Sequence, residues 1–90
     1  MFGMKTPLKL MIVKVMGDGS VMDARSLYRC LEPIYGTERQ FSLKRLERHL
    51  QALKAVGMLE AAGAVLENGK DLVVSYRLTA HGLRKVAELG

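Results

Sequence analysis

Residues 42–59 read SLKRLERHLQALKAVGML, and this segment carries the clearest structural signals in the chain. Its leucines recur every three or four residues, which is the period of one face of an α-helix. Ser42 is typical of a helix cap, because its hydroxyl can accept a hydrogen bond from a backbone N–H of the first turn. Gly57 is typical of the left-handed residue that follows a helix. We therefore predict a helix over 42–56 that leads directly into an apolar strand.

The sequence beyond Gly57 predicts a β-hairpin over 58–78. Its apolar residues alternate, and Asn68-Gly69 is a preferred pair for a two-residue type I′ turn. That turn pairs Glu67 with Lys70 and, nearer the base, Glu60 with Arg77, so both charged pairs have opposite signs. The same register predicts a single apolar face, which consists of the pairs Val65–Leu72, Gly63–Val74, Ala61–Tyr76 and Leu59–Leu78.

The first predicted helix has two apolar faces. Thr6 and Pro7 begin it, as its cap and its first helical residue, and Gly17-Asp18-Gly19 ends it. One face has the spacing of a core face and consists of Leu8, Met11, Ile12, Val15 and Met16. Leu10 and Val13 lie on the opposite face between two lysines, so we expect them to be exposed and to form part of a subunit contact.

The remaining predicted elements are a second helix, a short strand and a last helix. Asp23 caps the second helix, and Pro33 ends it, because the residue before a proline is disfavoured in the helical conformation. Residues 20–22 could add a short strand beside the hairpin. Thr79 caps the last helix, which covers 79–89.

The composition is that of one small globular domain over residues 1–90. Apolar residues make up 49% of the chain and charged residues 26%, and residues 1–5 form a loose N-terminus. No apolar run approaches the roughly 20 residues of a membrane-spanning helix. With one cysteine and two histidines, neither of which has a second ligand at metal spacing, we predict no metal site. A single cysteine cannot form an internal disulfide, so we expect a cytoplasmic protein. The sequence also holds no catalytic or cofactor-binding motif, so we expect that the protein is not an enzyme.

Positive charge is concentrated around the third helix. The chain has 14 Lys and Arg against nine Asp and Glu, and residues 39–54 hold five of the basic residues with one acid. On a helical wheel, the residues across from the leucines of the third helix are Lys44, Arg45, Arg48 and Gln51. Such a face suits a polyanionic partner, and it is also common as a solvated surface that keeps a small protein soluble.

The predicted order of elements resembles a winged helix-turn-helix domain. Residues 46–59 look like the recognition helix and first wing strand of bacterial regulators. Residues 76–82, YRLTAHG, are similar to the Tyr-x-Leu-Thr-x-x-Gly signature at the end of the wing in PadR-like and MarR-like repressors. The resemblance implies an α+β fold with a three-helix core, a two-stranded wing hairpin and a C-terminal helix.

The resemblance also implies that the chain is a transcriptional regulator that binds double-stranded DNA. The third helix would enter the major groove with Lys44, Arg45, Arg48 and Gln51. Further DNA contacts are expected from Arg25, Arg29, Arg39 and Lys70. A homodimer would place two such helices in successive grooves, with a dimer contact made by Leu10, Val13, Leu83 and Val86. The alternative is a protein–protein adaptor that does not bind DNA and takes its partner on the first helix.

Overall fold

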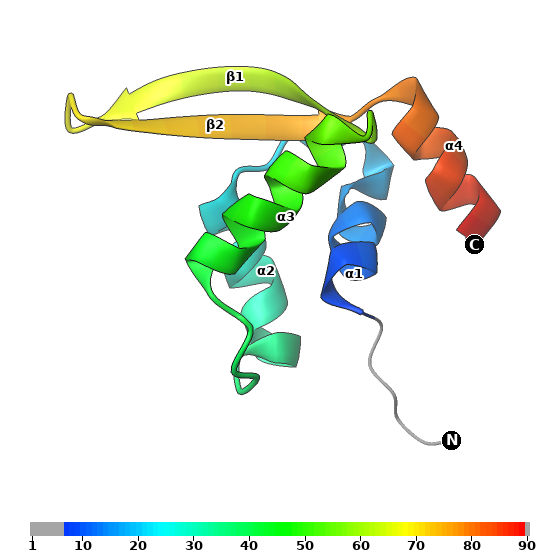
Figure 1. Cartoon of the computed structure of the whole chain (residues 1–90), viewed down its shortest axis with the longest axis horizontal. Coiled ribbons are helices and arrows are strands. Elements are labelled where there is room, and N and C mark those ends of the chain that lie inside the picture. The colour runs from blue at the N-terminus through cyan, green and yellow to red at the C-terminus, as the bar shows by residue number, and fades with distance from the viewer. Residues whose placement is uncertain (1–6, 90) are drawn as a thin grey trace.

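The computed structural model describes residues 7–89 of the chain (Figure 1). The elements in this range are α1 (Leu8–Val15), the short 3₁₀ helix η1 (Met16–Asp18), α2 (Ala24–Tyr35), α3 (Leu43–Ala55), β1 (Leu59–Glu67), β2 (Asp71–Leu78) and α4 (Ala80–Leu89). The two strands form an antiparallel sheet. This α+β order of three helices, a hairpin and a helix is the one that the sequence predicts. The expected loose segment 1–5 lies outside the described residues.

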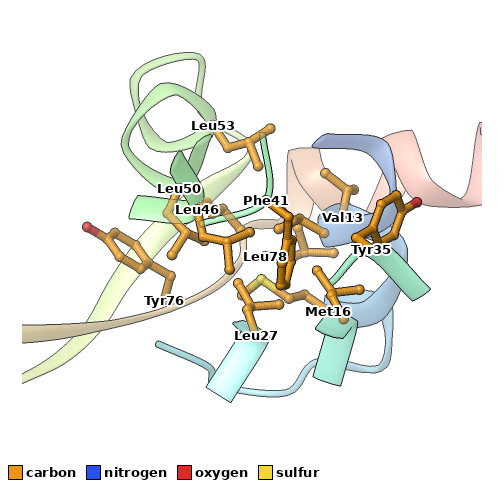
Figure 2. Packing of buried hydrophobic residues seen from close by; sticks show 13 residues of the cluster. Val13, Met16, Leu27, Tyr35, Phe41, Leu46, Leu50, Leu53, Tyr76 and Leu78 are labelled. Carbon is orange, nitrogen blue, oxygen red and sulfur yellow. The ribbon is translucent and has the colours of Figure 1, made fainter. Parts of the chain in front are cut away.

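The hydrophobic core lies where α1, α2 and α3 meet the base of the hairpin (Figure 2). In Figure 1 the hairpin extends to one side of this core, and α4 lies on the other side, next to α1. Every element except α4 supplies core residues, and the loop before α3 adds one more aromatic ring. The buried residues are Ile12, Val13, Met16, Leu27, Leu31, Tyr35, Phe41, Leu46, Leu50, Leu53, Leu59, Tyr76 and Leu78.

The predicted core face of the first helix packs in or against the core, but burial extends to a residue of the opposite face. Val13, which was expected to be exposed, is only 2% exposed and belongs to the core, while Leu10 is half-buried. The helix has neighbours on two sides, α2 and α3 on one and α4 on the other, so little apolar surface remains free (Figure 1). Pro7 precedes the first helical residue, and its carbonyl accepts the Met11 N–H at 3.0 Å, so Pro7 takes the cap position predicted for Thr6. Thr6 itself lies outside the described residues.

The second helix starts as predicted and ends later than predicted. The Asp23 carboxylate caps it by accepting the Ser26 N–H at 2.8 Å. Pro33 lies inside the last turn and does not end the helix, although its missing N–H removes one backbone hydrogen bond. The additional turn places Tyr35 in the core, with its ring 6.3 Å from that of Phe41. Burial of this large side chain offsets the lost hydrogen bond near the helix end.

Both ends of α3 are formed by the residues that the sequence indicates. The Ser42 hydroxyl accepts the Arg45 N–H at 3.1 Å. At the other end, Gly57 has a φ of 82°, and its N–H donates to the Lys54 carbonyl at 3.0 Å. The Met58 N–H donates to the Leu53 carbonyl at 2.9 Å, which completes a Schellman motif. This tight helix end directs the chain straight into β1.

The start of α4 is tied to the end of α3 by Thr79. Its hydroxyl donates to the Gly57 carbonyl at 2.6 Å and accepts the Gly82 N–H at 3.0 Å, which confirms Thr79 as the cap. Its own N–H donates to the Met58 carbonyl at 3.0 Å. Gly82 packs so closely here that a Cβ on it would lie 2.3 Å from the Met58 carbonyl oxygen. The threonine and glycine of the predicted signature therefore serve to join α4 to the α3–β1 connection.

We call β1, β2 and the loop between them the wing, and its two halves differ in register. In the base of the wing (Leu59–Ala61 and Tyr76–Leu78) the predicted pairs are confirmed, including Glu60 with Arg77. In the tip of the wing (63–67 and 71–75) the register is shifted by one residue, and Glu67 pairs with Asp71 instead of Lys70. The predicted short strand is present as a single bridge, in which Met22 and Tyr76 exchange hydrogen bonds of 2.8 and 2.9 Å.

The shift follows from one additional residue in the loop and one unpaired residue on β1. Lys70 joins a three-residue loop, while Ala62 is left as a bulge beside Gly63, and the two irregularities offset each other at the base. Asn68 and Gly69 do adopt the predicted positive φ, at 55° and 69°. The shifted register places Leu66 opposite Leu72 and Val65 opposite Val73, so apolar residues face each other on both sides of the tip. The predicted single apolar face is therefore confirmed at the base, by Leu59–Leu78 and Ala61–Tyr76, and wrong at the tip.

Candidate nucleic-acid interface

The exposed face of α3 carries the basic residues that the sequence places there. Leu46, Leu50 and Leu53 are buried, which fixes the orientation of the helix. The side chains on the other faces are exposed, namely Lys44, Arg45, Arg48 and Gln51. Among residues 7–89, the ion pairs found are those of Arg25, Arg77 and Lys85, so Lys44, Arg45 and Arg48 carry no internal carboxylate partner. They are available to an external anion.

His49 lies one turn after Arg45 on α3, and its pKa is influenced by the charges of Arg45 and of Lys9 on α1. His49 is half-buried on the same side of α3. Burial lowers the pKa of His49 below its ordinary value of 6.5, and the positive charges of Lys9 and Arg45 lower it further. The neutral imidazole is therefore favoured at neutral pH. His49 then adds no positive charge to the basic face of α3.

A groove between α2 and the start of α3 brings two more of the predicted residues together. Its lining residues are Arg25, Tyr28, Arg29, Phe41, Ser42 and Leu43. The rings of Tyr28 and Phe41 stack with their centroids 4.6 Å apart, which packs α2 against the segment that enters α3. Arg29 is exposed beside this groove. The two arginines of α2 thus lie next to the first turn of the basic helix, whereas Arg39 is exposed in the preceding loop.

A second cleft, of about 500 Å³, separates α3 from the wing. Gln51 lines it together with Glu47, so these two side chains face the wing. The β2 side of the cleft supplies Asp71 as well as apolar residues. The full lining consists of Ala24, Arg25, Leu43, Glu47, Leu50, Gln51, Asp71, Leu72, Val73, Val74 and Tyr76. The cleft therefore contains two carboxylates, whereas the basic residues Lys44 and Arg48 are absent from its lining.

One contact across this cleft was not predicted from the sequence. Arg25 Nη1 donates to both carboxylate oxygens of Glu67, with a distance of 2.6 Å to Oε2. The partners are 42 residues apart, and the contact joins the first turn of α2 to the tip of the wing. Sequence reasoning missed it because the predicted register assigned Glu67 to Lys70. Lys70 is exposed in the wing loop and takes part in none of the ion pairs found in the described part of the chain.

The predicted dimer residues have different surroundings. Val13 is buried in the core and cannot form a surface contact without unfolding α1. Leu10 is half-buried, and Val86 is half-buried against the core. Leu83 is 42% exposed on α4. Of the four, Leu83 is the residue that offers a substantial apolar side chain to a second molecule.

No helix within residues 7–89 is both long and apolar enough to cross a membrane. In the same range, no group of three or more His, Cys, Asp and Glu side chains is placed to hold a metal ion.

Comparison with known proteins identifies the class of fold. No family model matches the chain, and no curated protein is similar to it in sequence. Among solved structures, the crystal structure of a "putative transcriptional regulator" from Thermoplasma acidophilum matches with a TM-score of 0.67. The match covers 90% of this chain and 74% of that chain, with 16% sequence identity. Together with the element order, this likeness assigns the chain the winged-helix fold.

Proposed function

We propose that this chain is a double-stranded DNA-binding protein that inserts α3 into the major groove. The observation that carries the proposal is the face of α3 on which Lys44, Arg45 and Arg48 are exposed and lack internal partners. The opposite face is fixed in the core, so these side chains are presented by a rigid element. The solved structure with the same fold is described as a transcriptional regulator, which supports the same function for this chain, acting in the cytoplasm.

The residues of the interface divide into two chemical roles. Arg48 and Gln51 can each make a bidentate contact to a base edge, Arg to guanine and Gln to adenine. Cations at the ends and edges of the interface more often bind phosphate, which positions the protein without reading sequence. We assign that role to Lys44, Arg45, Arg25, Arg29, Arg39 and Lys70.

A homodimer completes the proposal. Two copies related by a two-fold axis would place their α3 helices in major grooves about 34 Å apart on a pseudo-palindromic site. Since Val13 is buried, the contact would rest on α4, with Leu83 at its centre and Val86 and Leu10 at its edge. Sedimentation equilibrium of the wild type and of Leu83→Lys tests this contact. A wild type that stays monomeric at high micromolar concentration contradicts it.

The test of DNA binding is fluorescence anisotropy of a labelled random duplex at low and near-physiological salt. We expect the wild type to bind and to weaken steeply with salt. The variant Lys44→Ala/Arg45→Ala/Arg48→Ala should lose most of this binding, with a salt slope reduced by about 2, because Lys44 and Arg45 are the two phosphate contacts that it removes. A control with the same loss of charge is Lys14→Ala/Arg84→Ala/Lys85→Ala, whose residues are exposed on α1 and α4. Equal loss in both variants would show that net charge, and not α3, governs binding.

The second candidate function is a protein–protein adaptor, and one observation favours it. The tip of the wing exposes aliphatic side chains, with Leu66 61% and Leu72 62% exposed. Such a patch is more typical of a protein contact than of a phosphate contact. The burial of Val13 leaves α1 with little apolar surface, so a protein partner would use the wing rather than α1. Absence of duplex binding by the wild type even at low salt would favour this function over the first.

A further inference from the structure

The Arg25–Glu67 ion pair occupies one of the residues assigned to the DNA backbone. Arg25 is the first-turn arginine of α2 that lines both the groove beside α3 and the cleft beneath the wing. Its Nη1 atom donates to both oxygens of the Glu67 carboxylate. A DNA phosphate at the start of α3 would be bound by the same guanidinium, whose positive charge is already offset by the Glu67 carboxylate. Glu67 and a phosphate therefore compete for Arg25.

We propose that Glu67 is a regulatory carboxylate, which holds Arg25 and the tip of the wing together in the DNA-free protein and is displaced by a DNA phosphate. The inference rests on the proposed DNA-binding function, and it adds a mechanism that controls the contact between Arg25 and a DNA phosphate. Binding then includes an exchange, in which Arg25 leaves Glu67 and the wing tip separates from α2. The affinity of the protein for any duplex is lowered by the strength of the contact that must be broken.

The shifted register makes Glu67 depend on Arg25. Glu67 pairs across the strands with Asp71, so two acidic residues are direct cross-strand neighbours at the tip. Like charges directly opposite each other destabilise a hairpin, and the guanidinium of Arg25 neutralises one of them. When a phosphate takes Arg25, this repulsion returns and loosens the tip. Whether Arg25 binds Glu67 or a phosphate therefore determines how well ordered the tip of the wing is, although α2 and the wing lie far apart in the sequence.

The size of the effect follows from the exposure of the pair. Both side chains are nearly half exposed, and ion pairs of this kind change affinities or populations by roughly two- to five-fold. Glu67→Gln should therefore tighten duplex binding about two- to five-fold at low salt. The salt slope should stay close to that of the wild type, because Arg25 contacts a phosphate in both complexes.

A matched control lies on the same hairpin. Arg77 Nε donates to Glu60 Oε2 at 2.7 Å in an equally exposed pair at the base of the wing. Glu60→Gln removes the same charge but frees no arginine of the interface. We expect it to change duplex affinity by less than about 1.5-fold, a difference near the detection limit for an exposed ion pair. If Glu60→Gln tightens binding as much as Glu67→Gln does, the gain comes from net charge and the proposal is overturned.

The deciding experiment is a double-mutant cycle on duplex binding, with wild type, Arg25→Ala, Glu67→Gln and the double variant. We expect the gain from Glu67→Gln to vanish in the Arg25→Ala background, because no arginine remains to be released. A gain that persists there overturns the proposal while leaving DNA binding intact. A wild type that binds no duplex overturns the proposed function, and this proposal with it, so the two failures are distinguishable.

A measurement without DNA checks the structural half of the proposal. Amide hydrogen exchange at the tip of the wing should accelerate about two- to five-fold in Glu67→Gln and in Arg25→Ala, since the restraint is a single exposed ion pair. Exchange in α3 and at the base of the wing should not change. Unaltered exchange at the tip would show that the contact does not hold the wing, and would overturn the proposal.

Discussion

Both halves of the wing carry apolar residues on paired strands, but different interactions determine their strand register. At the base, Leu59, Tyr76 and Leu78 are buried against the helices, and the strands pair as the sequence predicts. At the tip, Leu66 and Leu72 are largely exposed, and the strands pair one residue out of the predicted register. Both halves belong to one hairpin with one turn. Leu59, Tyr76 and Leu78 make the base part of the core, whereas the tip contacts the core through the partly buried Val74.

The difference shows which force sets strand register in this fold. A one-residue slip at the base would turn Leu59 and Leu78 from the core to solvent, at a cost of several kcal/mol. A slip at the tip exchanges one set of exposed pairs for another, each worth only about 0.2–1 kcal/mol. The loop and the cross-strand pairs therefore decide the register of the tip, and the bulge at Ala62 reconciles it with the base.

The largest expected effect compares a buried with an exposed leucine of the wing. Leu59→Ala should lower the free energy of unfolding by about 3 kcal/mol, because it leaves a cavity in the core. Leu72→Ala, on the exposed part of the tip, should change it by less than about 0.5 kcal/mol. Chemical denaturation measures both values. Similar values for the two variants would mean that the tip is covered in solution, for example by a second molecule.

The next effect compares two glycines. Gly82→Ala should destabilise the protein by about 2 kcal/mol, because its Cβ would collide with the Met58 carbonyl oxygen, a backbone atom that cannot move freely. At the tip, a Cβ on Gly63 meets no atom within 4 Å. Gly63→Ala should therefore be neutral or stabilising by about 0.5 kcal/mol, through the reduced entropy of the unfolded chain. A strong destabilisation by Gly63→Ala would show that the bulge needs glycine, and that the tip is more constrained than its exposure indicates.

A smaller effect is expected at the cap that joins the base of the wing to α4. Thr79→Ala removes a hydroxyl that both donates to the Gly57 carbonyl and accepts the Gly82 N–H. We expect a loss of about 1 kcal/mol in the free energy of unfolding. Thr37→Ala, in the exposed loop after α2, is the matched control and should change stability by less than about 0.5 kcal/mol. Equal losses for the two threonines would mean that the hydroxyl of Thr79 does not hold α4 in place.

The same contrast explains how far the sequence predicts this fold. Elements whose ends are set by neighbouring residues are predicted well, such as the Ser42 cap, the Gly57 helix end and the Asp23 cap. Predictions fail where a distant contact outweighs the local signal. Burial of Tyr35 extends α2 through Pro33, and the position of α1 between α4 and the other helices leaves Val13 buried.

The candidate interface divides in the same way. The exposure of the α3 cations follows from the helical period alone, so the sequence predicts it. The contact between Arg25 and Glu67 depends on the register of the tip, which no local pattern sets. The acidic residues that line the cleft, Glu47 and Asp71, likewise come together only through the packing of α3 against the wing.

The smallest expected effect is a pH dependence of the stability, which arises among the helices and does not extend to the tip of the wing. Burial, with the charges of Lys9 and Arg45, lowers the pKa of His49 in the folded protein below its ordinary value of 6.5. The unfolded chain therefore binds more protons than the folded one between these two values. Stability should be highest above about pH 6.5 and should fall as the pH drops below it. His49→Gln should flatten this part of the profile, whereas His81→Gln, at an exposed position of α4, should leave it in place.

Two probes separate the body from the tip in this experiment. Global unfolding should follow the titration of His49, because the imidazole lies between α3 and α1 and its protonation charges a half-buried position beside two cations. Hydrogen exchange at the tip of the wing should show no such step over the same range, since that half of the hairpin opens without disturbing the core. A step in both probes would show that the tip unfolds only together with the helices. In that case the register shift at Ala62 would be part of the cooperative core. The loop would then no longer determine the register of the tip independently of the burial that determines the register of the base.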